Sequence, residues 1–225
     1  MNRLAVVCDF DGTATVLDIG DEISKHFGGE AHWLLQKRLF AEGKLDTRGI
    51  IQGIYTHVTA TEREVREFAV REARLRDGFI ELVQACKDAG APFYLASGGL
   101  RQYVEAVLEA HLAPELRQSI VVRANEGHFD SGGLRVTFPG DEPARLAGCS
   151  ECGSCKRVSV ADARKNGASY VIGVGDGFAD RCLARFADRL FAREGSYLHR
   201  WCEENRVACT PFTTLYGAAD AVRTA

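Results

Sequence analysis

The order of hydrophobic and polar positions along the chain predicts strands that alternate with helices. The apolar, β-branched run "LAVVC" at 4–8 stops at polar residues, which is typical of a buried strand. Similar runs predict further strands at 91–97, 119–127, 134–140, 169–176, 189–194 and 207–212. Segments with helical spacing separate most of these runs. The alternation predicts an α/β fold, in which a mostly parallel, Rossmann-like sheet carries helices on both faces.

Two features interrupt this regular alternation. The turn "FDSGG" lies between the runs 119–127 and 134–140, which predicts a small β-hairpin after the second or third core strand. Residues 14 to about 74 contain helices and no convincing strand, and Thr61 and Glu64 form a capping box for one of these helices. We interpret this block as a helical cap inserted after the first strand. The expected domains are a catalytic core of 1–14 and 75–225 and a cap of 15–74.

The composition is that of an ordinary globular protein, and it narrows the classes of function. Hydrophobic residues make up 46% and charged residues 26% of the 225 positions. The net charge of −3 gives no electrostatic case for binding nucleic acid or an anionic membrane. No apolar run approaches the roughly 20 residues that span a bilayer, and the first residues lack the pattern of a signal peptide. We therefore expect a cytoplasmic protein whose eight cysteines are mostly reduced.

Three of the predicted strands end in polar turns that contain glycine, namely "DFDGT", "SGG" and "GDGFAD". The carboxyl ends of parallel strands meet at one edge of a sheet, so these turns are expected to lie together. Four carboxylates would then be neighbours and would raise one another's pKa. They belong to Asp9, Asp11, Asp176 and Asp180. A hard divalent cation relieves this repulsion, and Mg²⁺ prefers such oxygen ligands.

Cationic and hydrogen-bonding groups are predicted at the same edge. Lys156 begins the helix that precedes the third motif, and the hydroxyls of Thr13 and Ser97 belong to the first two. Backbone N–H groups near Gly12 and Gly98 add further donors. These groups suit the oxygens of a phosphoryl group. The sequence thus predicts a site for phosphoryl transfer, with Mg²⁺ as cofactor.

In this order, the motifs resemble the four motifs of the haloacid dehalogenase superfamily. The matching residues are "DFDGT", "SGG", Lys156 and "GDGFAD", and they extend over residues 9–180. The helical block after the first motif resembles the cap of the phosphoserine-phosphatase branch. The resemblance implies a phosphatase that acts on a small-molecule phosphate ester through an aspartyl-phosphate and requires Mg²⁺.

The resemblance also implies a role for each motif residue. Asp9 would be the nucleophile, and Asp11 the acid that protonates the leaving oxygen and then the base that activates water. The metal ligands would be Asp9, Asp11 through its backbone carbonyl, and Asp176, while Asp180 would bind the metal through water or orient the site. The phosphate oxygens would be held by Ser97, Gly98 and Lys156, with Thr13 beside them.

A narrower resemblance concerns the substrate. The bacterial 2-hydroxy-3-keto-5-methylthiopentenyl-1-phosphate phosphatases of methionine salvage are similar in "CDFDGT", "PFYLASGG", "CSECGSCK" and the tail from "GDGFAD" through "LFARE". The expected substrate is this ester or a related sugar-like phosphate. Phosphoserine is the alternative substrate, and phosphoryl transfer to an alcohol is the alternative reaction. The alternative of another class is a non-catalytic metal-binding or regulatory protein on the same core.

Several of the candidate residues also have simpler interpretations. Lys165 competes with Lys156, although it would lie near the far end of the same helix. Asp180 can stabilise a helix N-terminus, and so can Asp18 at the start of the cap. Related phosphoserine phosphatases use an acid in this region to bind the amine of the substrate. This makes Asp18 a candidate substrate-binding residue.

The segment "CSECGSC" contains three cysteines with the spacing of thiolate metal ligands, namely Cys149, Cys152 and Cys155. A structural zinc site needs four ligands, and the chain has no CxxC motif outside this segment. The cluster is therefore a candidate structural metal or redox site, and reduced thiols are the alternative.

Overall fold

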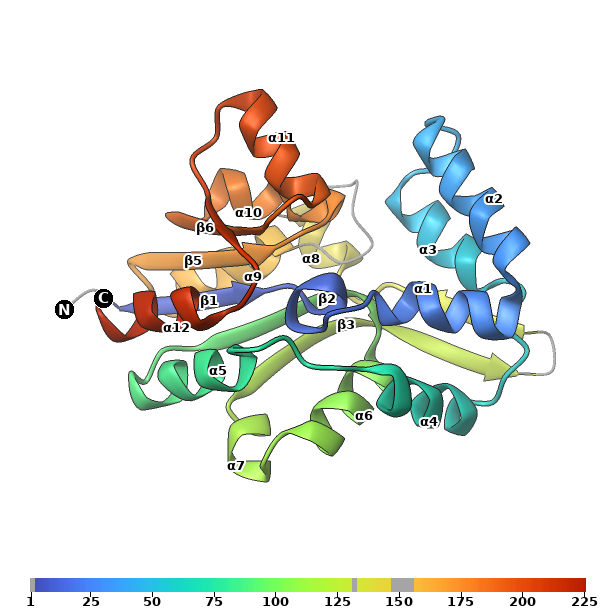
Figure 1. Cartoon of the computed structure of the whole chain (residues 1–225), viewed down its shortest axis with the longest axis horizontal. Helices are drawn as coiled ribbons and strands as arrows, with labels where there is room; N and C mark the ends of the chain where they lie inside the picture. Colours follow the sequence, from blue (N-terminus) through green and yellow to red (C-terminus); the bar gives the residue numbers. More distant parts are fainter. Residues whose placement is uncertain (1–2, 131–132, 147–155) are drawn as a thin grey trace.

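A seven-stranded sheet forms the centre of the computed structural model, which describes residues 3–130, 133–146 and 156–225 (Figure 1). The strand order is β4-β3-β2-β1-β5-β6-β7. The strands are β1 (Leu4–Cys8), β2 (Phe93–Leu100), β3 (Ile120–Asp130), β4 (Gly133–Thr137), β5 (Tyr170–Gly175), β6 (Arg189–Arg193) and β7 (Thr210–Phe212). Neighbouring strands are parallel except β3 and β4, which pair as an antiparallel hairpin. The predicted α/β fold and its hairpin are confirmed.

The central strand β1 is buried on both faces, which fixes the point where it ends. Val6 pairs with Phe93 of β2 on one side and with Ile172 of β5 on the other. Alternate residues of β1 enter two different hydrophobic clusters, one on each face of the sheet. A shift of one residue would exchange the two sets of side chains between the faces. This double burial therefore holds Asp9, the next residue, at the carboxyl edge of the sheet.

Helices cover both faces of the sheet (Figure 1). One face packs against α5 (Phe79–Asp88), α6 (Arg101–His111) and α12 (Tyr216–Arg223), and the other against α9 (Lys156–Lys165), α10 (Arg181–Phe186) and α11 (Tyr197–Asn205). The short elements are α7 (Pro114–Arg117), α8 (Asp141–Leu146) and the single turn η3 (Phe178–Asp180). In the described part of the chain, no helix has the length and apolar character needed to cross a membrane.

The segment between β1 and β2 is helical, as the sequence predicts. It contains the turn η1 (Phe10–Ala14), α1 (Ile19–Ile23), the turn η2 (Ser24–Gly28), α2 (Glu30–Ala41), α3 (Thr47–Tyr55) and α4 (Glu62–Glu72). The predicted capping box of Thr61 and Glu64 begins α4. Thr15 forms an isolated antiparallel bridge with Leu75, so the segment leaves and rejoins the core at one place. Helices α2 and α3 stand together above the hairpin, at the upper right of Figure 1.

The sequence interpretation missed three helices and joined two others. It left out α7, α8 and α12, of which the first two span only four and six residues. Such short segments show too few turns for a helical period to be recognised. It also continued one helix from Asp18 to Phe27, where the structure has α1 followed by η2. The strand predicted at 134–140 ends at Thr137, two residues before Pro139, which has no N–H for a ladder bond.

Arg76 joins the returning chain to the loop that follows β1. Its guanidinium donates to the backbone carbonyls of Gly12 (2.7 Å), Thr13 (2.8 Å) and Thr15 (3.2 Å). A further bond reaches the carbonyl of Thr213 (3.2 Å). Hydrogen bonds to a charged donor are stronger than neutral ones. Arg76 therefore holds the loop that carries the first motif against the core.

We expect Arg76→Met to lower the free energy of unfolding by about 2 kcal/mol, because the part-buried carbonyls of the loop lose their charged donor. Urea unfolding at neutral pH measures this change. Arg74→Met is the matched control, since Arg74 is largely exposed and its ion pair with Asp77 is long, at 3.7 Å. Equal stabilities of the two variants would contradict the role of Arg76.

Candidate active site

The first motif leaves β1 through a tight turn. Asp9 follows the strand directly and is buried, and Gly12 has a φ of +73°, which favours glycine. A Cβ atom on Gly12 would lie 2.7 Å from an oxygen of Asp176, so a side chain there would collide with that carboxylate. The glycine thus allows the first motif and the strand end of β5 to approach each other closely.

Lys156 is the cation at the centre of the site. Its side chain is buried, and Nζ forms ion pairs with Oδ1 of Asp9 (2.6 Å) and with Oδ1 of Asp180. Burial by itself lowers the pKa of Lys156, but the carboxylates of Asp180 and Asp9 more than offset this and raise its pKa above the ordinary value. The lysine is therefore positively charged at neutral pH. Lys165, the alternative candidate, is exposed at the other end of α9.

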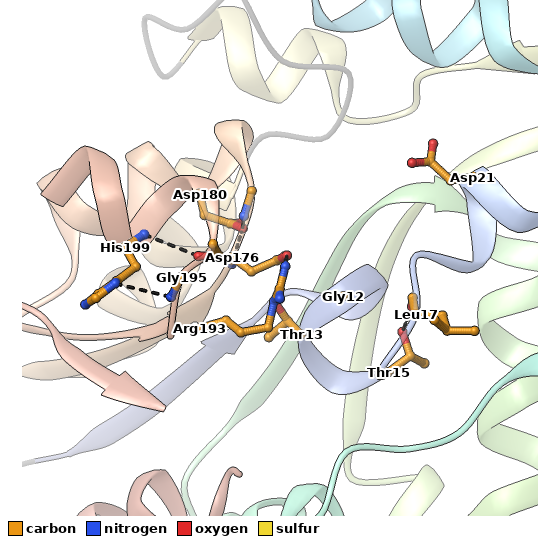
Figure 2. Close-up of polar contacts among 12 residues, drawn as sticks. Gly12, Thr13, Thr15, Leu17, Asp21, Asp176, Asp180, Arg193, Gly195 and His199 are labelled. Atoms are coloured by element: carbon orange, nitrogen blue, oxygen red, sulfur yellow. Dashed lines mark hydrogen bonds and ion pairs between the residues drawn. The ribbon is translucent and has the colours of Figure 1, made fainter. Parts of the chain in front are cut away.

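The two acids of "GDGFAD" are held by hydrogen bonds from separate elements. Asp176 accepts from the hydroxyl of Thr13 (3.0 Å) through Oδ1 and pairs with Arg193 of β6 (2.8 Å) through Oδ2 (Figure 2). Asp180 is completely buried, and its Oδ2 accepts the backbone N–H groups of Asp176 (2.9 Å) and Gly177 (2.8 Å). Asp180 thus folds the turn after β5 and faces Lys156 with its other oxygen.

Asp11 is held by four donors. Its Oδ1 accepts the backbone N–H groups of Ile19 (3.0 Å) and Gly20 (3.4 Å) at the start of α1. Its Oδ2 accepts the hydroxyls of Ser97 (3.0 Å) and Tyr103 (2.8 Å). Burial raises the pKa of Asp11, and the hydrogen bonds from Tyr103 and Ser97 partly offset this. A carboxyl group with a raised pKa is suited to donate a proton near neutral pH.

The glycines of "SGG" make room for Tyr103. A Cβ atom on Gly99 would lie 1.5 Å from the Tyr103 hydroxyl, so a side chain there would occupy the position of that hydroxyl. The backbone N–H of Gly99 also donates to Oγ of Ser97 (2.8 Å), which orients the serine toward Asp11. The backbone of Gly98 is held by Asn125 of β3, whose side-chain amide donates to the Gly98 carbonyl (2.8 Å).

We expect Tyr103→Phe to lower kcat for phosphate ester hydrolysis about tenfold, since Asp11 loses a hydrogen bond from a neutral donor. The hydroxyl bonds the ionised carboxylate and lowers its pKa, so its removal raises the pKa of Asp11. The limb of the pH–rate profile that reports protonated Asp11 then moves to higher pH. Rates measured across pH test both effects. An unchanged profile would contradict the coupling of Tyr103 to Asp11.

Three of the carboxylates can hold a metal ion. Asp9, Asp176 and Asp180 each offer an oxygen, and these atoms lie within 4.8 Å of one another. Burial raises the pKa of Asp9 well above its ordinary value, although the Lys156 ammonium opposes this shift. Among the described residues, two cations, Lys156 and Arg193, form the ion pairs of the four motif acids, so a divalent cation would balance their charge. The donor set, entirely carboxylate oxygens, fits Mg²⁺.

A cavity of about 220 Å³ opens above these residues. Its floor includes all four motif acids, Asp9, Asp11, Asp176 and Asp180, together with Gly98 and Lys156. Helices α1, α2 and α3 contribute its opposite side. Asp18 also lines the cavity, while its Oδ1 accepts the backbone N–H of Asp21 (2.8 Å) as the N-cap of α1. Asp18 thus caps α1 and also lines the cavity, and its contact with substrate stays a prediction.

The structure brings the predicted residues together at one edge, with two differences in detail. Ser97 lies beneath the cavity and bonds Asp11, and the Thr13 hydroxyl bonds Asp176. Their predicted contacts with phosphate stay predictions. The candidate cysteines Cys149, Cys152 and Cys155 fall outside the described residues.

Sequence interpretation missed three polar groups at the site, those of Tyr103, Arg193 and Lys37. Arg193 had a usable signal, because it ends a parallel strand at the same edge as the motifs. Tyr103 had a weaker one, since it belongs to the helix that begins directly after "SGG".

Comparison with known proteins agrees with the motifs. Residues 6–185 match the model of the haloacid dehalogenase-like hydrolase family. A 2-hydroxy-3-keto-5-methylthiopentenyl-1-phosphate phosphatase of Geobacillus thermodenitrificans is 31% identical over 219 residues, covering 97% of this chain and 94% of the relative. The protein of the same name from Exiguobacterium sibiricum is 29% identical over 222 residues, with 98% and 97% covered.

Solved structures agree with the fold. A substrate-bound phosphoserine phosphatase superposes with a TM-score of 0.71 at 18% identity, covering 98% of both chains. A phosphoserine phosphatase described as a phospho-aspartyl intermediate analogue gives 0.70 at 17% identity, also with 98% of both chains covered. The family match covers most of the chain, and the motifs that carry it converge on one cavity. The chain therefore belongs to the haloacid dehalogenase-like hydrolase family, in which the relatives named above are phosphatases.

Proposed function

We propose that this phosphatase hydrolyses a small phosphate monoester in a Mg²⁺-dependent reaction that passes through a phosphorylated Asp9. The observation that carries the proposal is that Asp9, Lys156 and the two acids of "GDGFAD" line one cavity. Within the described part of the chain, Oδ2 of Asp9 makes no hydrogen bond, whereas Oδ1 is held by Lys156. The lysine thus fixes the carboxylate and leaves one oxygen for attack.

The proposed reaction has two chemical steps. First, a carboxylate oxygen of Asp9 forms a bond to phosphorus, the bond from phosphorus to the ester oxygen breaks, and Asp11 gives its proton to the departing alcohol. Second, Asp11 takes a proton from water, the water oxygen bonds to phosphorus, and the Asp9 carboxylate leaves with both electrons of its bond. Phosphate is released, and both side chains return to their starting states.

The charges of the site support these steps. Lys156 faces both Asp9 and the incoming phosphoryl oxygens from the cavity floor. Asp9, Asp176 and Asp180, with the backbone carbonyl of Asp11, would hold Mg²⁺, which when bound supplies charge neutralisation to the phosphoryl group. The backbone near Gly98 supplies further polar groups at the cavity wall.

We further propose that residues 15–74 act as a cap. Asp11 supports this role because it is bonded at once to the core, through Ser97, and to the first helix of the inserted segment, through Ile19. Movement of α1 would release two of the four donors that hold Asp11. Closure of the cap would exclude water from the phosphorylated enzyme, and opening would release the products.

The proposed substrate is 2-hydroxy-3-keto-5-methylthiopentenyl-1-phosphate, the ester in the names of the relatives found by sequence. The enclosed volume suits a small metabolite better than a folded phosphoprotein. Phosphoserine is the second candidate. It is favoured by the presence of both an acid, Asp18, and a cation, Lys37, in the cavity wall.

The test measures release of phosphate from both esters by the purified protein, with Mg²⁺ or with EDTA. We expect hydrolysis that needs Mg²⁺ and a kcat/KM for the methylthiopentenyl ester at least about tenfold above that for phosphoserine. A preference for phosphoserine would replace the proposed substrate. Absence of phosphate release from either ester, and from p-nitrophenyl phosphate, would overturn the proposed function.

A further inference from the structure

The two sides of the cavity differ in chemistry. The floor carries the charged residues of the four motifs, as described above. The opposite side is formed in large part by α3, which contributes Ile50, Ile51, Ile54 and Tyr55. Phe178, which belongs to "GDGFAD", adds an aromatic surface. We call Ile50, Ile51, Ile54 and Phe178 the apolar wall. A group bound at the floor therefore has a hydrocarbon surface within the same cavity, beside the charged residues Asp18, Asp21 and Lys37.

The apolar wall begins directly beside the phosphate-binding motif. A Cβ atom on Gly98 would lie 3.6 Å from Cδ1 of Ile51, which is ordinary van der Waals contact. Ile50 and Ile51 are only half-buried, so part of each side chain still faces open space. Ile54 is buried against the core and anchors the helix. A carbon chain attached to a phosphoryl group above Gly98 would reach Ile51 within its first few atoms.

Contacts with the β-hairpin hold α3 in this position. Oε1 of Gln52 accepts the backbone N–H of Val136 in β4 (2.9 Å). Arg48, one turn earlier on α3, pairs with Asp141 of α8 (2.9 Å). Asp46 caps the start of the helix by accepting the N–H of Gly49 (2.7 Å). These contacts hold the wall against the core in the arrangement that the structure describes.

The charged groups on the cap side of the cavity are already engaged. Nζ of Lys37 pairs with Asp21 (2.7 Å). Burial alone lowers the pKa of Lys37, but the carboxylates of Asp21 and Asp18 outweigh it and raise the pKa. Asp18 faces the N-terminus of α1, whose backbone N–H at Asp21 it accepts. A charged group on the substrate would have to compete with these contacts for Lys37 and for Oδ1 of Asp18.

We infer that the apolar wall selects phosphate esters whose carbon chain ends in an uncharged, apolar group, and that Ile51 is a specificity-determining residue. The inference rests on the proposed function and narrows it to a class of substrate. A thioether end belongs to this class, because sulfur and methyl groups bury well against isoleucine. An amino-acid ester does not, because its charged end would lie against hydrocarbon.

A series of n-alkyl phosphates from methyl to hexyl tests the inference with defined probes. Each added methylene that reaches the wall is expected to raise kcat/KM about fourfold, the change that burial of one methylene group supplies. In Ile51→Ala the rise per methylene is expected to weaken, so that hexyl phosphate loses about tenfold while methyl phosphate is unchanged. Ile80→Ala, at an exposed position of α5, is the matched control and should follow the wild type.

The outcomes separate this inference from the proposed function. A kcat/KM that does not rise with chain length in the wild type would contradict the role of the apolar wall. An equal loss of kcat/KM on methyl and hexyl phosphate in Ile51→Ala would contradict it as well. Both results would leave the proposed phosphatase function intact. Absence of hydrolysis of every ester would overturn the proposed function itself. If Ile51→Ala unfolds, Ile51→Val gives the same comparison, with an expected loss on hexyl phosphate of about twofold to fivefold.

Discussion

Asp9→Asn is expected to leave the protein folded and to lower the rate of phosphate ester hydrolysis at least about 10⁴-fold. The amide cannot attack phosphorus as a carboxylate does, and it removes one negative oxygen from the acid cluster. Folding should survive because Lys156 keeps its ion pair with Asp180. Phosphate release in the presence of Mg²⁺ measures the rate, and circular dichroism checks the fold.

Asp46→Asn is the matched control for this change. Asp46 is exposed and caps α3, far from the motif acids along the chain, and asparagine caps a helix as well as aspartate does. The control should keep both stability and activity. Residual hydrolysis by Asp9→Asn above about one hundredth of the wild-type rate would contradict a nucleophilic Asp9. Trapping of ³²P on the wild-type protein and not on Asp9→Asn would support it directly.

The sequence predicted the floor of the site because strand ends determine it. A run of apolar residues that is buried on both faces ends where the first carboxylate appears, so Asp9 follows β1 at the carboxyl edge. The same holds for Ser97 in β2 and for Asp176 after β5. Parallel pairing then brings the three strand ends together, whatever the details of the loops. The α/β fold and the floor thus depend on the same hydrophobic pattern.

The side of the cavity that α1, α2 and α3 contribute was not predictable in this way. Its residues come from helices, and the direction of a helix depends on tertiary contacts that a sequence period does not contain. Ile51 faces the cavity because Gln52, the next residue, bonds β4 across 84 positions of sequence. Lys37 meets Asp21 only once α2 has folded back over α1. Neither pair shares a motif or a spacing that could have been recognised beforehand.

Positions of individual side chains at the floor also needed the structure. Helical spacing places Tyr103 on the buried face of α6 with Val107, which is true, yet it gives no sign that the hydroxyl reaches Asp11. That contact exists because Gly99 has no Cβ atom. The Thr13 hydroxyl, which is predicted to contact phosphate, bonds Asp176 in the structure. The residue pattern does not determine side-chain torsion angles, on which such contacts depend.

Lys156→Met is expected to lower the free energy of unfolding by about 3–5 kcal/mol and to abolish most of the activity. The lysine is buried, and it is paired at once with Asp9 and Asp180. Methionine fills a similar volume but supplies no charge, so both carboxylates stay buried without their cation. Urea unfolding at pH 7 with EDTA present measures the change, because EDTA keeps divalent cations from replacing the lost charge.

Two further variants decide whether unpaired charge is the cause. Lys165→Met, at the exposed end of the same helix, should change stability by less than about 0.5 kcal/mol. Adding Asp180→Asn to Lys156→Met removes one of the two uncompensated carboxylates while keeping an oxygen for the N–H groups of the turn after β5. The double variant should therefore be more stable than Lys156→Met alone, although each single change is destabilising. If the two losses simply added, the lysine would contribute through packing rather than through its ion pairs.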